Sequence, residues 1–224
     1  MVGLYVRDEQ SLVLKPPAAR PLGGATRWWL SQSLRALGKS LNAIGGTLVL
    51  RTGPAAAVIA ALAHEINAQA VFWNTIAQAP HHAIAGEIES ALASDGIGSE
   101  IFPGDLLVDP KAIRNKDNRG LRVFTPFWRR VQGLGDPAKP LPAPKKFTSI
   151  GGVASEALDG WTLEPTRPDW AGGLRESWTP GEAGAQARLK AFLDETIRGY
   201  SDDRDRPDRD GTSRLSPRSW SSTS

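Results

Sequence analysis

The residues best suited to bind a ligand lie near the C-terminus, where a glycine precedes a run of hydroxyl side chains. Gly211 permits a tight turn, and Thr212, Ser213 and Ser216 offer hydroxyls and backbone N–H groups that can bind phosphate near a helix start. Arg214 adds a permanent positive charge. Taken alone, the Gly-Thr-Ser run is better explained as a helix-capping turn in a polar tail, so only a longer pattern can favour phosphate binding.

A second candidate site is the basic stretch from Lys111 to Lys146. It holds ten Lys and Arg residues against two Asp, whereas the whole chain carries a net charge of only +3. A concentrated cationic stretch attracts a polyanion such as DNA through counterion release, and a solvated surface loop is the alternative. Phe127, Trp128, Arg129 and Arg130 suit base stacking and phosphate contact, but they suit packing of a connector equally well.

Composition argues against several kinds of site and location. The chain has no cysteine, and the adjacent His81 and His82 would point in different directions on a helix, so we expect a surface pair at a helix start and no metal. No apolar stretch approaches the roughly 20 residues that span a bilayer, and no secretory signal is readable. We therefore expect a cytoplasmic protein with no membrane partner.

The elements that position these residues follow from the hydrophobic pattern. From Val2 to Phe102, short β-rich runs alternate with longer amphipathic runs, which is typical of βαβ units with a parallel sheet. The pattern predicts strands at Val2–Val6, Thr47–Leu50, Ala70–Trp73 and Ser99–Phe102, and helices over Arg27–Ile44, Pro54–Ile66 and around Ile84–Leu92. This predicts an α/β fold with a doubly wound parallel sheet. In the first helix, the apolar stripe is expected at Leu30, Leu34, Leu37, Leu41 and Ile44.

The character of the chain changes after about Phe124, because prolines become frequent and the periodicity fades. The stretch predicts an extended connector. A helix entered through Pro180, capped by Thr179 or Ser177, is expected to continue toward Tyr200. The expected organisation is an α/β domain over residues 1–125, a proline-rich connector over 126–178, the start of a helical domain over 179–217 and a tail over 218–224.

Five segments, taken in order, resemble the DNA photolyase and cryptochrome family. They are Arg20–Leu30, Thr47–Arg51, Phe124–Trp128, Pro168–Gly181 and Gly199–Pro217. The last is the most specific, because Tyr200 is followed twelve residues later by Thr-Ser-Arg-Leu-Ser. The resemblance covers nearly the whole chain up to Pro217.

The resemblance implies an N-terminal α/β domain, a long connector and a helical domain that holds FAD and the DNA lesion, in a protein that is usually monomeric. It implies that light excites reduced FAD, which passes an electron to a cyclobutane pyrimidine dimer, and the electron returns after the dimer splits. The resemblance also assigns site residues. Arg204 is expected to contact the damaged DNA, and the expected FAD contacts are Tyr200, Thr212, Ser213, Arg214, Leu215 and Ser216.

The chain departs from the family pattern at three places. The family's first strand, with a Trp-Phe-Arg-Arg-Asp-Leu-Arg type of signature, has no counterpart before Val2. After Pro217 the family reads His-Leu-His-Phe-Gly, but this chain reads Arg218, Ser219 and Trp220, which suggests a gene fragment or a shifted reading frame. Only Asn74 matches the run that helps to hold a folate or deazaflavin antenna, so a divergent or lost antenna is expected.

These departures predict a fragment without repair activity of its own. There are three alternatives. The first is a fragment of a cryptochrome, which is a noncatalytic blue-light photoreceptor; the others are an α/β nucleotide-binding module and a basic DNA-binding module. The nucleotide-binding module is weakened because no Gly-x-Gly-x-x-Gly or Walker-type loop follows any expected strand.

The absent first strand leads to a prediction about stability. That strand lies centrally in the family's sheet, so its absence leaves neighbouring strands with backbone groups that cost free energy unless they are paired. We expect a marginally stable or aggregation-prone product. A cooperative thermal transition together with a native-like near-UV circular dichroism spectrum would contradict this.

Overall fold

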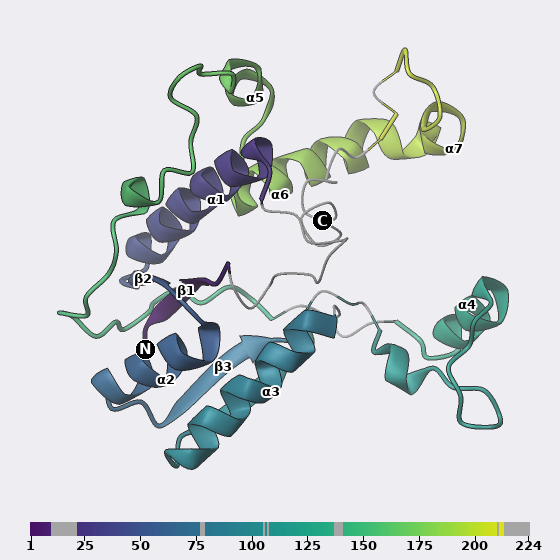
Figure 1. Cartoon of the computed structure of the whole chain (residues 1–224). Helices are drawn as coiled ribbons and strands as arrows, with labels where there is room; N and C mark the ends of the chain where they lie inside the picture. The colour runs from purple at the N-terminus through teal and green to yellow at the C-terminus, as the bar shows by residue number, and fades with distance from the viewer. Residues whose placement is uncertain are drawn as a thin grey trace. The chain divides into compact units, whose positions relative to one another are not determined.

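The structure is a computed structural model that describes residues 1–9, 22–76, 79–104, 106, 108–136, 141–209 and 211–212. Its internal contacts divide the chain into two compact units. One unit contains Met1–Tyr5, Ala19–Leu50 and Lys146–Ser224, and the other contains Val6–Ala18 and Arg51–Lys145. Figure 1 shows the course of the chain through both units.

A βαβ arrangement forms the centre of the second unit. The strands β3 (Ala70–Asn74) and β4 (Gly98–Phe102) are parallel, with Ala70 opposite Gly98, and the helix α3 (Ala79–Ser94) connects them. The helix α2 (Ala55–Glu65) lies beside α3 (Figure 1). Ala63, Ile88 and Leu92 form the buried cluster, as the spacing of Ile88 and Leu92 predicts.

The remaining two strands, β1 (Gly3–Arg7) and β2 (Leu48–Thr52), form a separate two-stranded sheet. The Gly3 N–H donates to the Thr47 carbonyl, and the Gly53 N–H donates to the Arg7 carbonyl, both at 3.1 Å. Because the partners advance together along both segments, these strands are parallel. The α/β prediction is confirmed, and within the described residues the four strands pair as β1–β2 and β3–β4.

The first helix, α1 (Gly24–Ala43), buries a face that matches the predicted leucine stripe only in part: Leu34 is buried and Leu30 packs against its cluster. Its buried residues are Trp28, Ser31 and Leu34, whereas Leu37 is 45% exposed. The reason is tertiary: Ser31 faces Glu164, so a polar residue belongs to the buried face. Leucine spacing alone cannot reveal a buried serine that is satisfied by a distant carboxylate.

The expected connector contains helical turns and part of a core. It includes most of α4 (Phe124–Gln132), together with η2 (Leu158–Trp161) and α5 (Gly172–Ser177), and the short turn η1 (Pro110–Ala112) precedes it. Pro126 lies in the first turn of α4, where a missing N–H costs nothing, so this proline is compatible with the helix. Trp161 and Leu163 are buried in one cluster with Leu34 and Leu50. The boundaries of the connector stay a prediction.

The helix after Pro180 exists, but its predicted cap is wrong. The helix α6 spans Glu182–Ala191, and its N-cap is Gly181 with no side-chain cap hydrogen bond, so neither Thr179 nor Ser177 caps it. Gly181 has φ of +103°, and a Cβ at this position would lie 2.7 Å from the Ala36 Cβ. The backbone conformation and the close approach to α1 both require glycine.

Helical turns continue from α6 toward the C-terminus. A π-helical turn, η3 (Phe192–Thr196), is followed by the 3-10 turn η4 (Ile197–Gly199) and the short helix α7 (Tyr200–Asp203). They follow one another end to end (Figure 1). This run carries the helical path as far as Tyr200, the first residue of α7, as the sequence predicts.

The described residues contain neither a membrane-spanning helix nor a cluster of metal-ligating side chains. No described helix is both long enough and apolar enough to cross a bilayer. Within the same residues, no three His, Cys, Asp or Glu side chains gather as a metal site would require. His81 and His82 lie in the first turn of α3, where His82 is exposed.

Asp8 is the residue whose removal tests the second unit. It is only 6% exposed, and its Oδ2 accepts a hydrogen bond of 2.7 Å from the N–H of Ala55, the first residue of α2. Since this N–H has no partner within the helix, we expect Asp8→Ala to destabilise the protein by about 1 kcal/mol, measured from the midpoint of urea denaturation. Glu9→Ala removes an exposed carboxylate one residue away, and an equal loss of stability in both variants would contradict the capping role.

Candidate functional site

Tyr200 and Arg204 form the described centre of the candidate site. The Tyr200 ring is 40% exposed and meets the Phe192 ring edge-on, with 5.8 Å between ring centroids. The Arg204 guanidinium carbon lies 5.8 Å from the Tyr200 ring centroid, which is a cation–π arrangement. The structure therefore brings together the residue expected at FAD and the residue expected at DNA.

The loop after α7 carries several carboxylates, most of which have an arginine partner. Asp203 accepts a hydrogen bond of 3.1 Å from Arg209, and Asp208 accepts one of 2.8 Å from Arg206. The Arg204 Nε lies 3.4 Å from Asp205. These pairs neutralise negative charge that would otherwise repel an anionic ligand at this position.

Gly211 folds the chain back against α7. A Cβ at Gly211 would lie 2.3 Å from the Asp203 carbonyl oxygen and 2.7 Å from the Asp203 Cβ, so only glycine permits this approach. Gly211 is buried, and the following Thr212 is exposed. Gly211 contacts the helix that carries Tyr200, and Thr212 is the next residue in the chain. The other predicted FAD contacts, Ser213, Arg214, Leu215 and Ser216, lie outside the described residues.

The described part of the site fits the edge of a flavin dinucleotide pocket in its chemistry. An exposed aromatic ring suits packing against a flat ring system, and an exposed hydroxyl beside a glycine turn suits a phosphate oxygen. The carboxylates of Asp203 and Asp208 are engaged by arginines, so they oppose a diphosphate less than free carboxylates would. We infer the fit only for Tyr200, Gly211 and Thr212.

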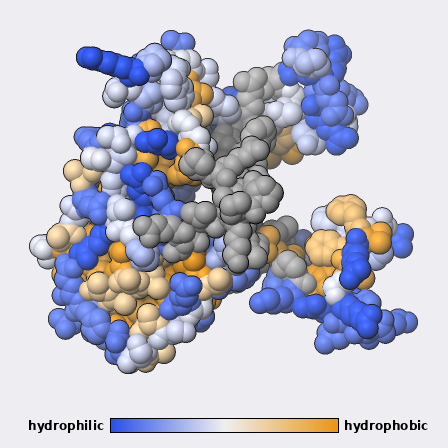
Figure 2. All heavy atoms as spheres, viewed as in Figure 1, coloured by the Kyte–Doolittle hydropathy of each residue, from blue (hydrophilic) through white to orange (hydrophobic). Residues whose placement is uncertain are grey.

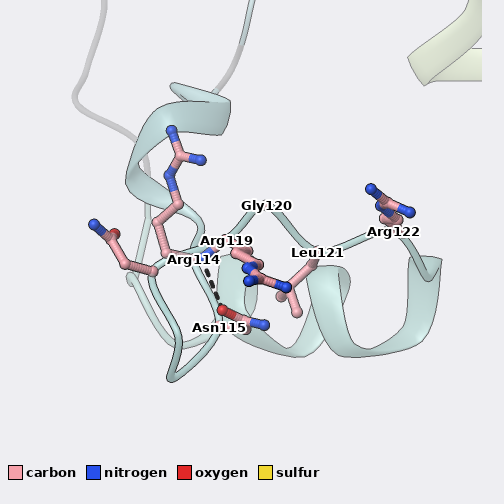
Figure 3. A pocket seen from close by; sticks show the side chains of 7 residues that line it. Arg114, Asn115, Arg119, Gly120, Leu121 and Arg122 are labelled. Atoms are coloured by element: carbon pink, nitrogen blue, oxygen red, sulfur yellow. Dashed lines mark hydrogen bonds between the residues drawn. The ribbon is translucent and has the colours of Figure 1, made fainter.

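A second group of cations lies in the basic stretch. A hollow of about 750 Å³ is lined by three arginines together with asparagine, glycine and leucine (Figure 3). The lining residues are Arg114, Asn115, Asn118, Arg119, Gly120, Leu121 and Arg122. The sequence predicts the excess of positive charge but not which residues line the hollow. Those residues are brought together by a turn that Asn115 holds, and a count of charges contains no information about that turn.

Comparison with known proteins decides the family. The profile described as DNA photolyase matches residues 1–145. The chain belongs to the DNA photolyase family. This membership removes the alternative of an unrelated nucleotide-binding module, and it agrees with the order of the five segments noted above.

Individual members of the DNA photolyase family give the same result. The deoxyribodipyrimidine photo-lyase of Agrobacterium fabrum is 38% identical over 218 residues, which are 97% of this chain and 44% of that protein. Cryptochrome-1 of Arabidopsis thaliana is 29% identical over 198 residues, 87% of this chain and 29% of that protein. The chain thus spans less than half the length of these relatives.

Solved structures in the DNA photolyase family confirm the fold. The crystal structure of a bacterial class III photolyase from Agrobacterium tumefaciens superimposes with a TM-score of 0.87 at 39% identity, over 96% of this chain and 43% of that one. The cryptochrome of Synechocystis gives a TM-score of 0.78 at 19% identity, over 96% of this chain and 46% of that one, and shows the fold alone.

The ion pair between Arg206 and Asp208 leads to a test by pH titration. The hydrogen bond from Arg206 holds the pKa of Asp208 below its ordinary value. Because folding lowers the pKa of this carboxyl, the ion pair stabilises the loop at pH values above the ordinary carboxyl pKa. This contribution is lost as the pH falls through the lowered pKa. In Arg206→Gln we expect the pKa of Asp208 to rise toward its ordinary value, measured by NMR of the carboxyl carbon. Arg198→Gln is the control, and an equal rise in that variant would contradict the assignment.

Proposed function

We propose that this chain forms the α/β part and the opening edge of the flavin site of a light-driven, FAD-dependent DNA photolyase that acts on cyclobutane pyrimidine dimers. The observation that supports it best is 38% identity, over 97% of the chain, to a protein named deoxyribodipyrimidine photo-lyase. Damaged DNA is the proposed substrate of the complete protein, and the cytoplasm its proposed location.

Tyr200 and Thr212 are the described residues proposed to contact FAD, with Ser213, Arg214, Leu215 and Ser216 as the further contacts. When bound, the flavin supplies the light-driven electron transfer. The chain's own residues would orient it: the Tyr200 ring by packing, and the hydroxyls by hydrogen bonds to phosphate. Arg204, the residue that follows α7, is proposed to reach the DNA backbone beside the flavin site, since its guanidinium lies on the Tyr200 ring.

We propose that the 224-residue chain does not repair DNA by itself. The proposed contacts fall in the last third of a chain that spans 44% of its Agrobacterium relative, and they offer only one edge of a pocket. A ligand as large as FAD needs groups on several sides for tight binding, because a few hydrogen bonds do not offset the cost of association.

A noncatalytic blue-light photoreceptor is the second candidate function. The match to cryptochrome-1 of Arabidopsis thaliana supports it, but the identity is 29%, against 38% for the photolyase of Agrobacterium fabrum. The nucleotide sequence on both sides of this reading frame discriminates between the two functions, since it would reveal whether coding sequence for a lesion pocket accompanies the chain.

The prediction is tested with a chimera in which residues 1–217 replace the matching part of the Agrobacterium photolyase. We expect the chimera to retain FAD and to repair dimers in light, and Ser213→Ala to weaken FAD binding roughly tenfold because it removes a hydrogen bond to a charged group. Ser201→Ala makes the same chemical change at an exposed hydroxyl of α7 outside the proposed contacts, and should leave FAD binding unchanged.

The unmodified chain, mixed with FAD and damaged DNA in light, should show no repair. Purification of this chain as a yellow protein with one tightly held FAD would overturn the proposal of an incomplete site. Equal weakening of FAD binding by Ser201→Ala and Ser213→Ala would overturn the assignment of the contacts.

A further inference from the structure

The described residues between 108 and 136 form an arm rich in uncompensated positive charge. Seven Lys and Arg residues stand against three Asp in this range. None of the seven forms an ion pair with a residue that the structure describes. The loop after α7 is the contrast, because its arginines are paired with aspartates. The arm is therefore the part of the second unit best prepared to attract a polyanion.

A compact turn organises the cations of this arm. Asn115 accepts hydrogen bonds at its Oδ1 from the N–H groups of Asp117 (3.0 Å) and Arg119 (2.8 Å), and its own N–H donates to the Arg119 carbonyl. Arg114 and Gly120 pair as an antiparallel bridge at the base of the turn. These contacts hold the backbone from Arg114 to Gly120 in one turn, and Arg114, Arg119 and Arg122 line a common hollow with their guanidinium groups spread in different directions (Figure 3).

The chemistry of the hollow favours phosphate. Its lining residues include three arginines, Arg114, Arg119 and Arg122, and two asparagines, and no carboxylate residue lines it. Guanidinium groups donate paired hydrogen bonds that match phosphate oxygens, and asparagine amides add neutral donors. Asp117, although it lies in the turn, is not among the lining residues.

An aromatic platform follows the hollow directly in the chain. Phe124 and Trp128 lie one turn apart on α4 with ring planes inclined by only 7° and centroids 6.3 Å apart. They are 72% and 44% exposed, and hydrophobic side chains gather at the surface of this part of the molecule (Figure 2). The two rings are therefore nearly parallel and exposed to solvent, and they follow Arg122 closely in the sequence. Exposed flat rings next to phosphate-binding cations are the combination by which proteins hold single-stranded nucleic acid.

We propose that residues 111–132 form a binding element for single-stranded polynucleotide, in which the arginine hollow holds the sugar–phosphate backbone and the rings of Phe124 and Trp128 stack on unpaired bases. The element acts in the dark and without flavin, so it is independent of the proposed function. A duplex offers the same phosphates but keeps its bases stacked inside, so single strands should bind more tightly.

The test uses the 224-residue chain without FAD in the dark, with fluorescence anisotropy of a labelled oligothymidylate, an oligouridylate and an undamaged duplex of equal length. We expect both single strands to bind more tightly than the duplex, with affinity falling steeply as salt rises. The double variant Arg119→Gln/Arg122→Gln should lower the salt slope by roughly 1.4, since each phosphate that is no longer neutralised lowers it by about 0.7. Phe124→Ala should weaken single-strand binding roughly tenfold.

Matched controls make the same chemical changes elsewhere. Phe72→Ala removes another exposed phenylalanine, on β3, and Arg198→Gln removes an arginine of η4; both should leave binding unchanged. Since all the side chains substituted in the arm are exposed or line an open hollow, circular dichroism of each arm variant should match that of the unmodified chain.

Four results would overturn the proposal. The first is failure of the unmodified chain to bind oligothymidylate at low salt. The second is an unchanged salt slope in the double arginine variant, and the third is duplex binding as tight as single-strand binding with no effect of Phe124→Ala. Displacement of oligothymidylate by polyglutamate at equal charge concentration would assign the arm to acidic proteins instead, and would also overturn it.

Discussion

The first unit depends on how the segment after residue 155 is held against α1. Glu164 accepts hydrogen bonds from the Ser31 hydroxyl at 2.8 Å and the Gln32 amide at 2.9 Å. Ser31 is almost fully buried, so the carboxylate of Glu164 satisfies a donor that would otherwise cost free energy. Trp161 and Leu163 meet Leu34 and Leu50 in the same region, and the apolar burial supplies the larger share of the stabilisation.

The same contact forces an unusual backbone conformation. Thr162 has φ of +47°, in the left-handed region that β-branched residues avoid, and it lies between the buried Trp161 and Leu163. Its carbonyl accepts a hydrogen bond of 2.6 Å from Arg27 Nη2 on α1. Burial on both sides and this hydrogen bond hold Thr162 in place, so the segment turns sharply before the chain reaches α5 and α6.

The parts of the fold that could be predicted from the sequence are those with local causes. The three strand–helix alternations before Phe102 are set by period and by Gly and Pro stops, and they are confirmed. The buried face of α1 was predictable only at Leu34 and Leu30, because Ser31 owes its burial to Glu164, which lies 133 residues away. Nor was α4, since a proline in the first turn reads as a helix breaker unless its position within the turn is known.

The candidate site likewise has parts that could be predicted from the sequence and parts that could not. Tyr200 at the start of α7 and the Gly211 turn follow from short-range pattern and family resemblance, and the structure brings residue 211 against Asp203. The stacking of Arg204 on Tyr200 depends on side-chain placement within one helical turn, which the order of residues permits but does not require. The hollow around Arg119 depends on Asn115, whose role is visible only when its hydrogen bonds are known.

The two arginine-bearing segments illustrate how charge is assigned to different tasks in one chain. In the loop after α7, Arg206 and Arg209 engage Asp208 and Asp203, so the segment is nearly neutral and its order depends on internal ion pairs. In the arm, the Arg114 Nε donates to the Lys111 carbonyl and the Arg119 N–H donates to Asn115, so the turn holds these two arginines without a carboxylate partner and leaves their charge for a ligand. A neutral loop suits the edge of a pocket that closes on a cofactor, whereas a charged, exposed arm suits a long flexible polyanion. Counting arginines would treat the two segments alike, and only the partners of each guanidinium separate them.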